Sequence, residues 1–181
     1  MRIVLLPSKR IARLLKNNSR SLHELEERGR VEIFIREQGG GEGIIEIEGE
    51  SENEWIAEQA LKAIDLGFEP KHAFKLFNEN YFLEVIDVGQ AMRGNERAVQ
   101  RQKARIIGEE GKAKKKIEEL SEALLALSDD ERVGIIGEFE EMKSAKEAIL
   151  RLLEGANHAG VFAFLKKEKD LREARRLGAA V

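Results

Sequence analysis

The sequence predicts an α+β fold built from two tandem copies of one small unit, each in the order strand, helix, helix, strand, strand, helix. Short apolar runs with a two-residue period indicate half-buried strands, and apolar residues spaced three or four apart between them indicate amphipathic helices. The second half then repeats the pattern of the first. With 181 residues, 42% of them hydrophobic, the chain can form two small domains.

In the first copy, turn-forming residues divide the apolar segments. Asn17-Asn18-Ser19-Arg20 is expected to break the first helix, and Gly29 to end the second. The stretch from Gln38 to Gly43 reads as a flexible hairpin loop. The expected elements are a strand at 2–6, a helix from Ser8 to the break, a helix to about Arg28, strands at 31–35 and 44–48, and a helix at 51–66.

Pro70 begins a short connecting helix, since proline suits the first helical turn. The second copy follows. The expected elements are a strand at 81–88, a loop at 89–95, a helix to Ile107, a helix after Gly111, strands at 123–127 and 132–136, and a helix at about 140–154.

The two copies also align residue by residue. At an offset of 92, Leu25-Glu26-Glu27 aligns with Ile117-Glu118-Glu119. After the hairpin, whose loop is four residues longer in the first copy, the offset becomes 88, and Gly67 aligns with Gly155. We interpret this agreement as duplication of one unit.

Beyond Gly155, residues 156–165 are expected to form a short helix packed on the body, and the highly charged residues 166–177 a solvated or frayed terminal helix. The predicted organisation is therefore an N-terminal domain at 1–67, a connecting helix at 68–80, a C-terminal domain at 81–155 and a helical extension at 156–181. The two domains are expected to pack together.

The loop Gly108-Glu109-Glu110-Gly111 separates the two central helices of the second copy. Glycine permits φ > 0 and lets another backbone approach closely. A helix that begins at Lys112 directs free N–H groups at the loop and favours an anion there. A GXXG loop between two helices is how KH domains clamp about four single-stranded nucleotides. The first copy has Lys16-Asn17-Asn18-Ser19 instead and is expected to have lost direct clamping, although Asn in a left-handed conformation could still form the turn.

Two other types of loop share part of this pattern. A Walker A loop is excluded, because Ile106 stands where its first glycine belongs and Ala113 replaces its hydroxyl residue. A plain helix–turn–helix connection with a solvated lysine face remains open. The local charge argues against this plain connection. Residues 93–116 hold nine cations and three anions in a chain of net charge −3, which is typical of a nucleic-acid-binding patch.

The sequence thus predicts a single-stranded RNA site. Its backbone contacts would come from the loop, its charge from the flanking cations, and an apolar groove for bases from Ile107 and the strand after Leu120. The candidate RNA-binding residues are Lys103, Arg105, Ile107, Gly108, Glu109, Glu110, Gly111, Lys112, Lys114 and Lys115. Aromatic stacking is poorly served, because residues 94–126 contain no Phe, Tyr or Trp.

Several segments resemble one known family. Arg105-Ile106-Ile107-Gly108-x-x-Gly111-Lys112 followed by Ile117-Glu118-Glu119-Leu120 is similar to the second KH domain of the archaeal Dim-two / Partner-of-Nob-one proteins. Phe82–Asp87, Ala63–Pro70 and Leu152–His158 look like flanking segments of that family. The resemblance covers residues 55–165 well and the first 50 in pattern only.

The resemblance implies tandem type I KH domains, of which only the second carries GXXG. It implies binding near the 3′ end of small-subunit ribosomal RNA during ribosome maturation. The implied partners are the Nob-type endonuclease and the alpha subunit of translation initiation factor two. The acidic Glu109 and Glu110 depart from the family pattern, in which at least one loop residue is usually basic, and they leave open a KH-fold protein-interaction module with weak or no RNA binding.

An enzyme is not expected. The three histidines, His23, His72 and His158, are far apart and lack ligand spacing, and nothing places Glu109 and Glu110 across a substrate. The chain has no cysteine, so no disulfide framework and no thiolate metal site are predicted. No cofactor and no other metal site are expected either. The apolar run at the start of the sequence is too short for a membrane span or signal peptide, and a cytoplasmic protein is expected.

Overall fold

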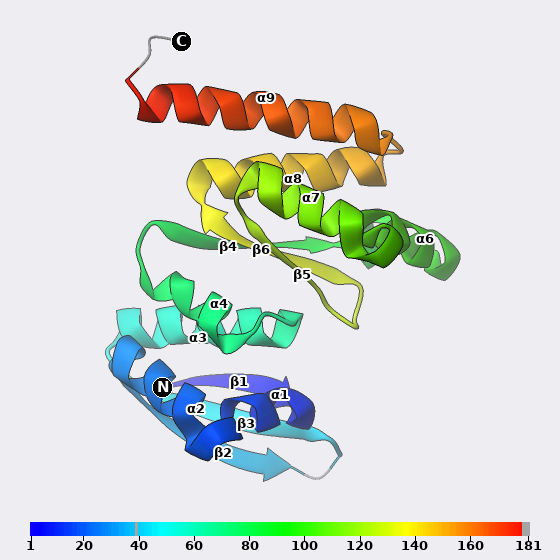
Figure 1. The fold of residues 1–181 in the computed structure, drawn as a ribbon. Coiled ribbons are helices and arrows are strands. Elements are labelled where there is room, and N and C mark those ends of the chain that lie inside the picture. Colours follow the sequence, from blue (N-terminus) through cyan, green and yellow to red (C-terminus); the bar gives the residue numbers. More distant parts are fainter. Residues whose placement is uncertain (39, 179–181) are drawn as a thin grey trace. The chain divides into compact units, whose positions relative to one another are not determined.

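A computed structural model describes residues 1–38 and 40–178 of the chain. These residues form two compact units, Met1–Tyr81 and Phe82–Val181. Each unit contains a three-stranded sheet and follows the predicted order of strands and helices (Figure 1). The predicted α+β fold of two tandem KH-like units is confirmed. Of the residues named in the predictions, Gly39 and residues 179–181 lie outside the described part.

The first unit has the strand order β1-β3-β2, with both neighbouring pairs antiparallel. Its elements are β1 (Arg2–Pro7), α1 (Ser8–Leu14), α2 (Lys16–Gly29), β2 (Val31–Gln38), β3 (Glu42–Gly49), α3 (Ser51–Leu66), α4 (Pro70–Ala73) and the 3-10 turn η1 (Phe74–Phe77). Alternation along the central strand buries Ile45 and Ile47. Helix α3 covers the same core with Ala60, Leu61 and Ile64, which lie on one helical face.

The second unit has the strand order β4-β6-β5. Its elements are β4 (Tyr81–Asp87), α5 (Val88–Ala91), α6 (Glu96–Ile107), the 3-10 turn η2 (Glu109–Gly111), α7 (Lys112–Ser121), β5 (Leu124–Leu127), β6 (Arg132–Glu138), α8 (Phe139–Leu153) and α9 (His158–Arg176). The sheet and helices share one core. Its fully buried members include Val99, Ile106, Ile117, Val133, Ile135, Ala145, Ala148, Ile149, Leu152 and Leu165.

One difference from the sequence prediction lies at residues 88–91, which were expected in a strand end and a loop. They form the single turn α5, because the Asp87 carboxylate accepts a hydrogen bond from the backbone N–H of Gln90 at 2.8 Å and caps that turn. The turn precedes α6 and leaves the GXXG loop unaffected.

The predicted internal repeat extends to atomic detail. In the first unit the Glu26 carboxylate accepts a hydrogen bond from Ile33 N–H at 3.1 Å, and in the second Glu118 accepts one from Leu125 N–H at 2.8 Å. Both pairs are related by the offset of 92. In each unit this contact ties the second helix to the strand that follows it.

Backbone conformation repeats as well. Arg30 and Glu122, again 92 residues apart, both end the second helix of their unit in the left-handed region, at φ 51° and 67°. After the hairpin, Gly67 and Gly155 end the third helices at φ 112° and 105°. Two units that share side-chain bonds and positive-φ positions are structural copies, which supports the duplication.

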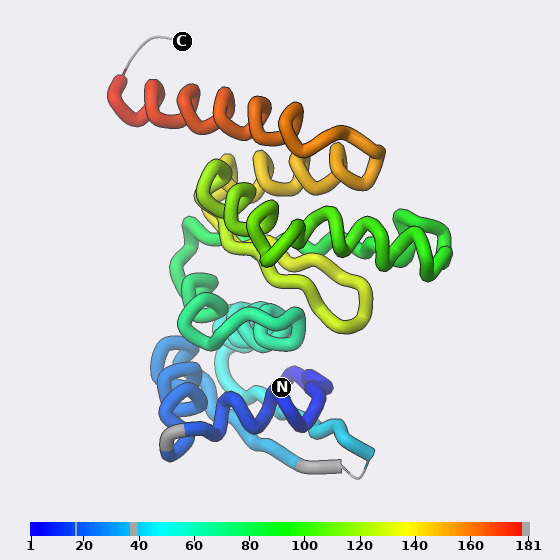
Figure 2. The backbone as a smooth tube through the Cα atoms, turned by 45° about the vertical axis from the view of Figure 1, so that its right-hand side comes forward, coloured from blue at the N-terminus to red at the C-terminus, as the bar shows by residue number. Residues whose placement is uncertain are grey.

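The C-terminal extension corrects the prediction of a short helix followed by a solvated or frayed one. Residues 158–176 form the single helix α9, which runs alongside α7 and α8 (Figure 2). Arg172, expected in the solvated part, is 5% exposed. Its guanidinium donates to the carbonyl oxygens of Leu120 and Ser121, both at 3.0 Å, and to the Ser144 hydroxyl at 2.9 Å. The charged segment is held because one of its charges satisfies the C-terminal carbonyls of α7.

Within the described residues, no helix has both the length and the apolar character needed to cross a membrane.

Candidate nucleic-acid interface

Gly108 fixes the start of the loop. It leaves α6 at φ 72° and ψ 176°, a region of the backbone map that is open almost only to glycine. A Cβ atom at this position would lie 2.5 Å from the Ala113 Cβ and 2.8 Å from the Ala113 nitrogen. The loop therefore folds back against the first turn of α7, and this contact leaves no room for a side chain.

Gly111 plays a different part. It is also left-handed, at φ 75°, but a Cβ added there would meet no described atom within 4 Å. It directly precedes α7, whose N-terminus receives no capping hydrogen bond from a described side chain. The first N–H groups of a helix lack partners within the helix. The open side of Gly111 thus leads to backbone donors and the positive end of a helix dipole, which together suit a phosphate.

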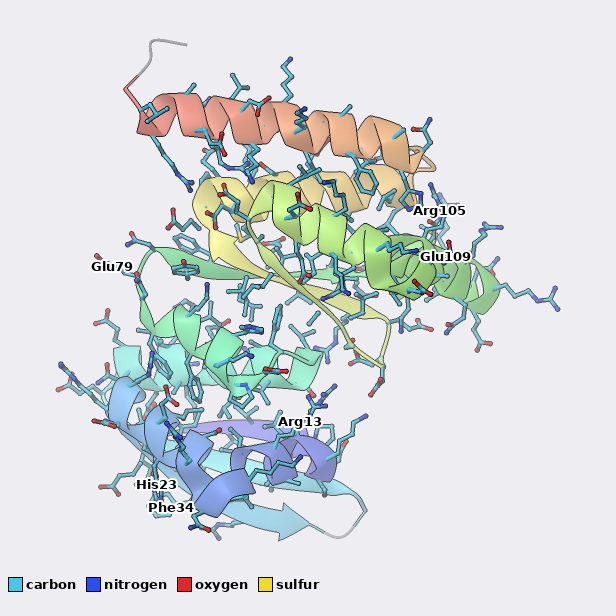
Figure 3. The ribbon with its side chains drawn as sticks, viewed as in Figure 1. Arg13, His23, Phe34, Glu79, Arg105 and Glu109 are labelled. Carbon is cyan, nitrogen blue, oxygen red and sulfur yellow. The ribbon has the colours of Figure 1, made fainter. Side chains whose placement is uncertain are left out.

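The candidate cations fall into two groups. Two of them are tied to the protein's own backbone. Lys103 donates to the carbonyl oxygen of Ser128 at 3.0 Å. Arg105 donates to the carbonyl oxygens of Leu152, at 2.6 Å, and Ala156. Figure 3 shows Arg105 beside the connection between α8 and α9. This guanidinium caps the end of α8, a role that sequence reasoning missed.

The lysines of α7 form the second group. Lys112 lies 3.3 Å from the Glu110 carboxylate, and both side chains are mostly exposed. Lys114 pairs with Glu118 at 3.0 Å, and Lys115 is exposed. An exposed ion pair such as that of Lys112 contributes little to stability. The ammonium groups of Lys112 and Lys115 can therefore turn to a phosphate at small cost, whereas Lys114 is half-buried beside Glu118.

The two acidic loop residues stand on the outside. Glu109 and Glu110 are exposed, and Glu110 adopts φ 52° between the two glycines. Its carboxylate lies against Lys112. Glu109 lies on the loop itself (Figure 3). The pairing of Glu110 with Lys112 offsets one of the two negative charges at the loop.

The residues predicted to form an apolar groove for bases differ in their exposure. Ile107 is 37% exposed although it ends an otherwise amphipathic helix. Leu124 and Leu127 of β5 are half-buried. Ile107 therefore offers apolar surface directly beside the loop, whereas its neighbour Ile106 is fully buried in the core.

The structure adds two residues that sequence reasoning did not place at the loop. His158 and Phe162, one turn apart at the start of α9, line a groove of about 430 Å³ together with loop and α7 residues. The other residues lining it are Gly108, Glu109, Lys112, Ala113 and Lys116. The expected lack of aromatic side chains holds for the neighbouring sequence but not for the folded site.

The break expected at Asn17–Arg20 of the first unit lies earlier, at Leu15, so these residues belong to the start of α2. They nevertheless keep part of the loop geometry. Asn18 and Ser19 adopt φ 57° and 58°, matching Glu110 and Gly111 at the offset of 92. Lys16, aligned with Gly108, is not among the described residues with positive φ. The first unit thus keeps the left-handed pair without the glycine-only position that opens the second loop.

Known proteins share this arrangement. A family model described as a eukaryotic-type KH domain (KH-domain type I), the second KH domain of PNO1, matches residues 82–170. A KH domain-containing protein of Methanocaldococcus jannaschii is 39% identical over 67% of this chain and 53% of its own length. The pre-rRNA-processing protein PNO1 of Coccidioides immitis is 30% identical over 60% of this chain and 43% of its own. The chain thus spans about half the length of these curated relatives.

Two crystal structures from Pyrococcus horikoshii OT3 cover nearly the whole chain. Dim2p superposes with a TM-score of 0.77 at 31% identity, over 92% of this chain and 99% of that one. A chain in the complex of a/eIF2alpha, aDim2p and rRNA superposes with a TM-score of 0.79 at 32% identity, over 93% of both chains.

The duplicated unit and its GXXG loop define a tandem protein of the type I KH class. The chain belongs to the Dim2/PNO1 family, as its sequence resemblance predicted.

Proposed function

We propose that this chain is an RNA-binding ribosome-assembly factor whose second unit holds single-stranded small-subunit rRNA near its 3′ end. The observation that carries the proposal is the loop from Gly108 to Gly111, which offers an open backbone and an uncapped helix start to a phosphate. The names of the relatives support it, since they include pre-rRNA-processing proteins and a complex of aDim2p with rRNA.

The proposed contacts follow from the geometry. Backbone N–H groups in the first turn of α7 receive the phosphates, and Lys112, Lys114 and Lys115 add charge. The Gly111 N–H itself donates to the Gly108 carbonyl oxygen at 3.2 Å, so Gly111 contributes the open approach and not a donor. Ile107 contacts the bases. Arg105 and Lys103 act indirectly, because their hydrogen bonds to backbone carbonyls hold α6 in place.

The proposed role is assembly and not catalysis. By the family resemblance, the partners would be the alpha subunit of initiation factor two and a Nob-type endonuclease, in the cytoplasm. The relative seen together with a/eIF2alpha and rRNA supports the first of these partners. We also propose that the functional division follows residues 1–67, 68–80, 81–155 and 156–181, with the phosphate-binding loop in the third part.

The test is a binding titration with a labelled fragment of the small-subunit rRNA 3′ end beside a scrambled strand, repeated at several salt concentrations. We expect the fragment to bind more tightly and both affinities to fall as salt rises, because phosphate contacts release counterions. Equal affinity for both strands would contradict the 3′-end assignment.

A matched pair of variants isolates the clamp. Gly111→Asp places a carboxylate at the loop, and Gly94→Asp makes the same change at another left-handed glycine, at φ 72°, where a Cβ also meets no described atom within 4 Å. Both changes strain the backbone alike, so a difference between the variants reports on the loop. We expect only Gly111→Asp to abolish RNA retention, because only its carboxylate lies at the loop and repels a phosphate. Equal binding by the two variants would refute the clamp.

The acidic loop favours a second candidate, a KH-fold module whose main ligand is protein. Glu109 and the Lys112–Glu110 pair reduce the positive charge at the loop. Replacing both glutamates by glutamine should then create RNA binding that the original chain lacks. If the original chain already binds RNA, this candidate fails.

A further inference from the structure

We propose that the start of α9 gives the loop a stacking site for one unpaired nucleobase. His158 and Phe162 lie beside Gly108 and Lys112 in one groove, outside the surface offered by Ile107. The inference rests on the proposed RNA binding and adds to it a residue-level site on the C-terminal extension.

The two rings are held in place. His158 Nε2 donates a hydrogen bond to the carbonyl oxygen of Arg105 at 2.8 Å, and this bond ties the start of α9 to the last turn of α6. The His158 and Phe162 ring centroids are 5.8 Å apart, with the planes inclined at 45°. Both side chains are half-buried, so each has one part packed and another open. A preorganised aromatic surface can bind a base without first paying for side-chain ordering.

A second set of hydrogen bonds, made by the Arg105 side chain, holds the start of α9 near the loop. Arg105, whose carbonyl oxygen binds His158, donates its guanidinium to the carbonyl oxygens of Leu152 and Ala156. One residue of α6 thus fixes both the end of α8 and the start of α9. The distance between the loop and the aromatic pair is therefore set by the fold.

The groove's lining identifies its occupant. Aromatic rings stack with bases of any sequence, and the lysines at 112 and 116, one turn apart on α7, suit the flanking phosphates. Lys112 pairs with Glu110 at 3.3 Å and is mostly exposed, and Lys116, which is half-buried, pairs with Glu119 at 3.2 Å. A groove volume of about 430 Å³ lies within the range of small-ligand sites. These features fit a nucleotide better than an acidic or an apolar peptide.

Glu109 adds a preference. It lines the groove and carries acceptor oxygens only. A carboxylate accepts hydrogen bonds from the exocyclic amino group of a base, as from cytosine N4. The site should therefore favour a base with an exocyclic amino group over uracil. The carboxylate of Glu109 would then select among bases, although its negative charge weakens phosphate binding.

The experiment places 2-aminopurine, a fluorescent base quenched by stacking, at successive positions of the rRNA 3′-end fragment and records fluorescence on binding to the full chain. We expect quenching at one position. Phe162→Ala should abolish that quenching and weaken binding about tenfold, the size of one base–aromatic stack. Phe162→Leu, which keeps apolar volume in the groove, should abolish the quenching as well.

Phe164→Ala is the matched control. Phe164 is also half-buried on α9 but lies under the Arg151 guanidinium, 3.9 Å from its ring centroid, and lines a different groove. We expect it to retain quenching and affinity. If the original chain binds no RNA, the proposed function and this site fail together. If RNA binds and depends on Gly111, but Phe162→Leu quenches like the original chain, the stacking site alone is overturned.

Discussion

Gly108 and Gly111 look equivalent in the motif but differ in what surrounds them. Gly108 combines a glycine-only backbone conformation with a contact that excludes a side chain, whereas Gly111 has open space beside it. The first glycine builds the loop, and the second leaves its surface accessible.

Gly108→Ala should therefore destabilise the chain by about 2–4 kcal/mol, from backbone strain and overpacking against Ala113. Gly111→Ala should cost about 1 kcal/mol, the penalty of a left-handed alanine. Denaturant unfolding of both variants measures the difference. Equal losses would show that the loop does not pack on α7 in this way.

Arg105 donates hydrogen bonds to backbone carbonyls, so its role is structural. Arg105→Met should lower the free energy of unfolding by about 2–3 kcal/mol, because charged hydrogen bonds to the carbonyls of Leu152 and Ala156 are lost. Lys115→Met, at an exposed position, should leave stability within about 0.5 kcal/mol and weaken RNA binding. Unfolding and binding titrations on the two variants separate these roles, and the reverse pattern would contradict the assignment.

At the scale of elements, α9 belongs to the second unit and is not an appended tail. Its apolar face contributes Val161 and Leu165 to the core, and Arg172 closes the C-terminal end of α7. The segment beyond Gly155 is thereby part of the body that carries the loop.

Arg172→Met should destabilise the second unit by about 2–4 kcal/mol, because buried carbonyls of α7 lose their donors. Amide hydrogen exchange along α9 should accelerate. Arg175→Met is the control, since Arg175 is 58% exposed and lies 3.8 Å from its partner Glu140. Unchanged exchange in Arg172→Met would mean that apolar contacts alone hold α9.

In the first unit, a carboxylate joins β1 to α3. Hydrogen bonds from Lys62, at 2.8 Å, and Arg2, at 2.6 Å, hold the pKa of Glu58 below its usual value, although burial opposes them. Since the folded-state pKa is lowered, this stabilisation is present above the unfolded-state pKa of about 4.3 and is lost as the pH falls through the folded value.

Glu58→Gln should therefore flatten the decline of the unfolding free energy below about pH 5. Glu52→Gln, at an exposed position of the same helix, should keep the original slope. Unfolding curves at several pH values test this, and identical slopes for Glu58→Gln and the original chain would dismiss the linkage.

For the whole molecule, the net charge does not indicate the proposed RNA binding. The chain carries −3 overall, so nucleic-acid affinity must come from local contacts. A KH loop holds about four nucleotides, and each phosphate contact to a single strand contributes about −0.7 to the logarithmic salt slope. We expect a slope of about −2 to −3. A slope near zero in the titrations would exclude a phosphate clamp.

The sequence by itself determined the duplicated unit, the element order and the position of the loop. These follow from local rules: strand alternation, helical periodicity and the backbone freedom of glycine act between residues that are neighbours in the chain. The offset of 92 is visible in the sequence, where Leu25-Glu26-Glu27 aligns with Ile117-Glu118-Glu119, and the glutamate–strand hydrogen bonds of the two units repeat it.

Only the tertiary structure decided what each charged or aromatic side chain contacts. Arg105 meets Leu152, and Arg172 meets Leu120, across 47 and 52 residues of sequence. His158 and Phe162 reach the loop in the same way, from a segment about 50 residues away. Such partners depend on how the helices pack, and no local pattern encodes them. The fold therefore supplied the capping roles and the aromatic groove that the loop motif alone could not predict.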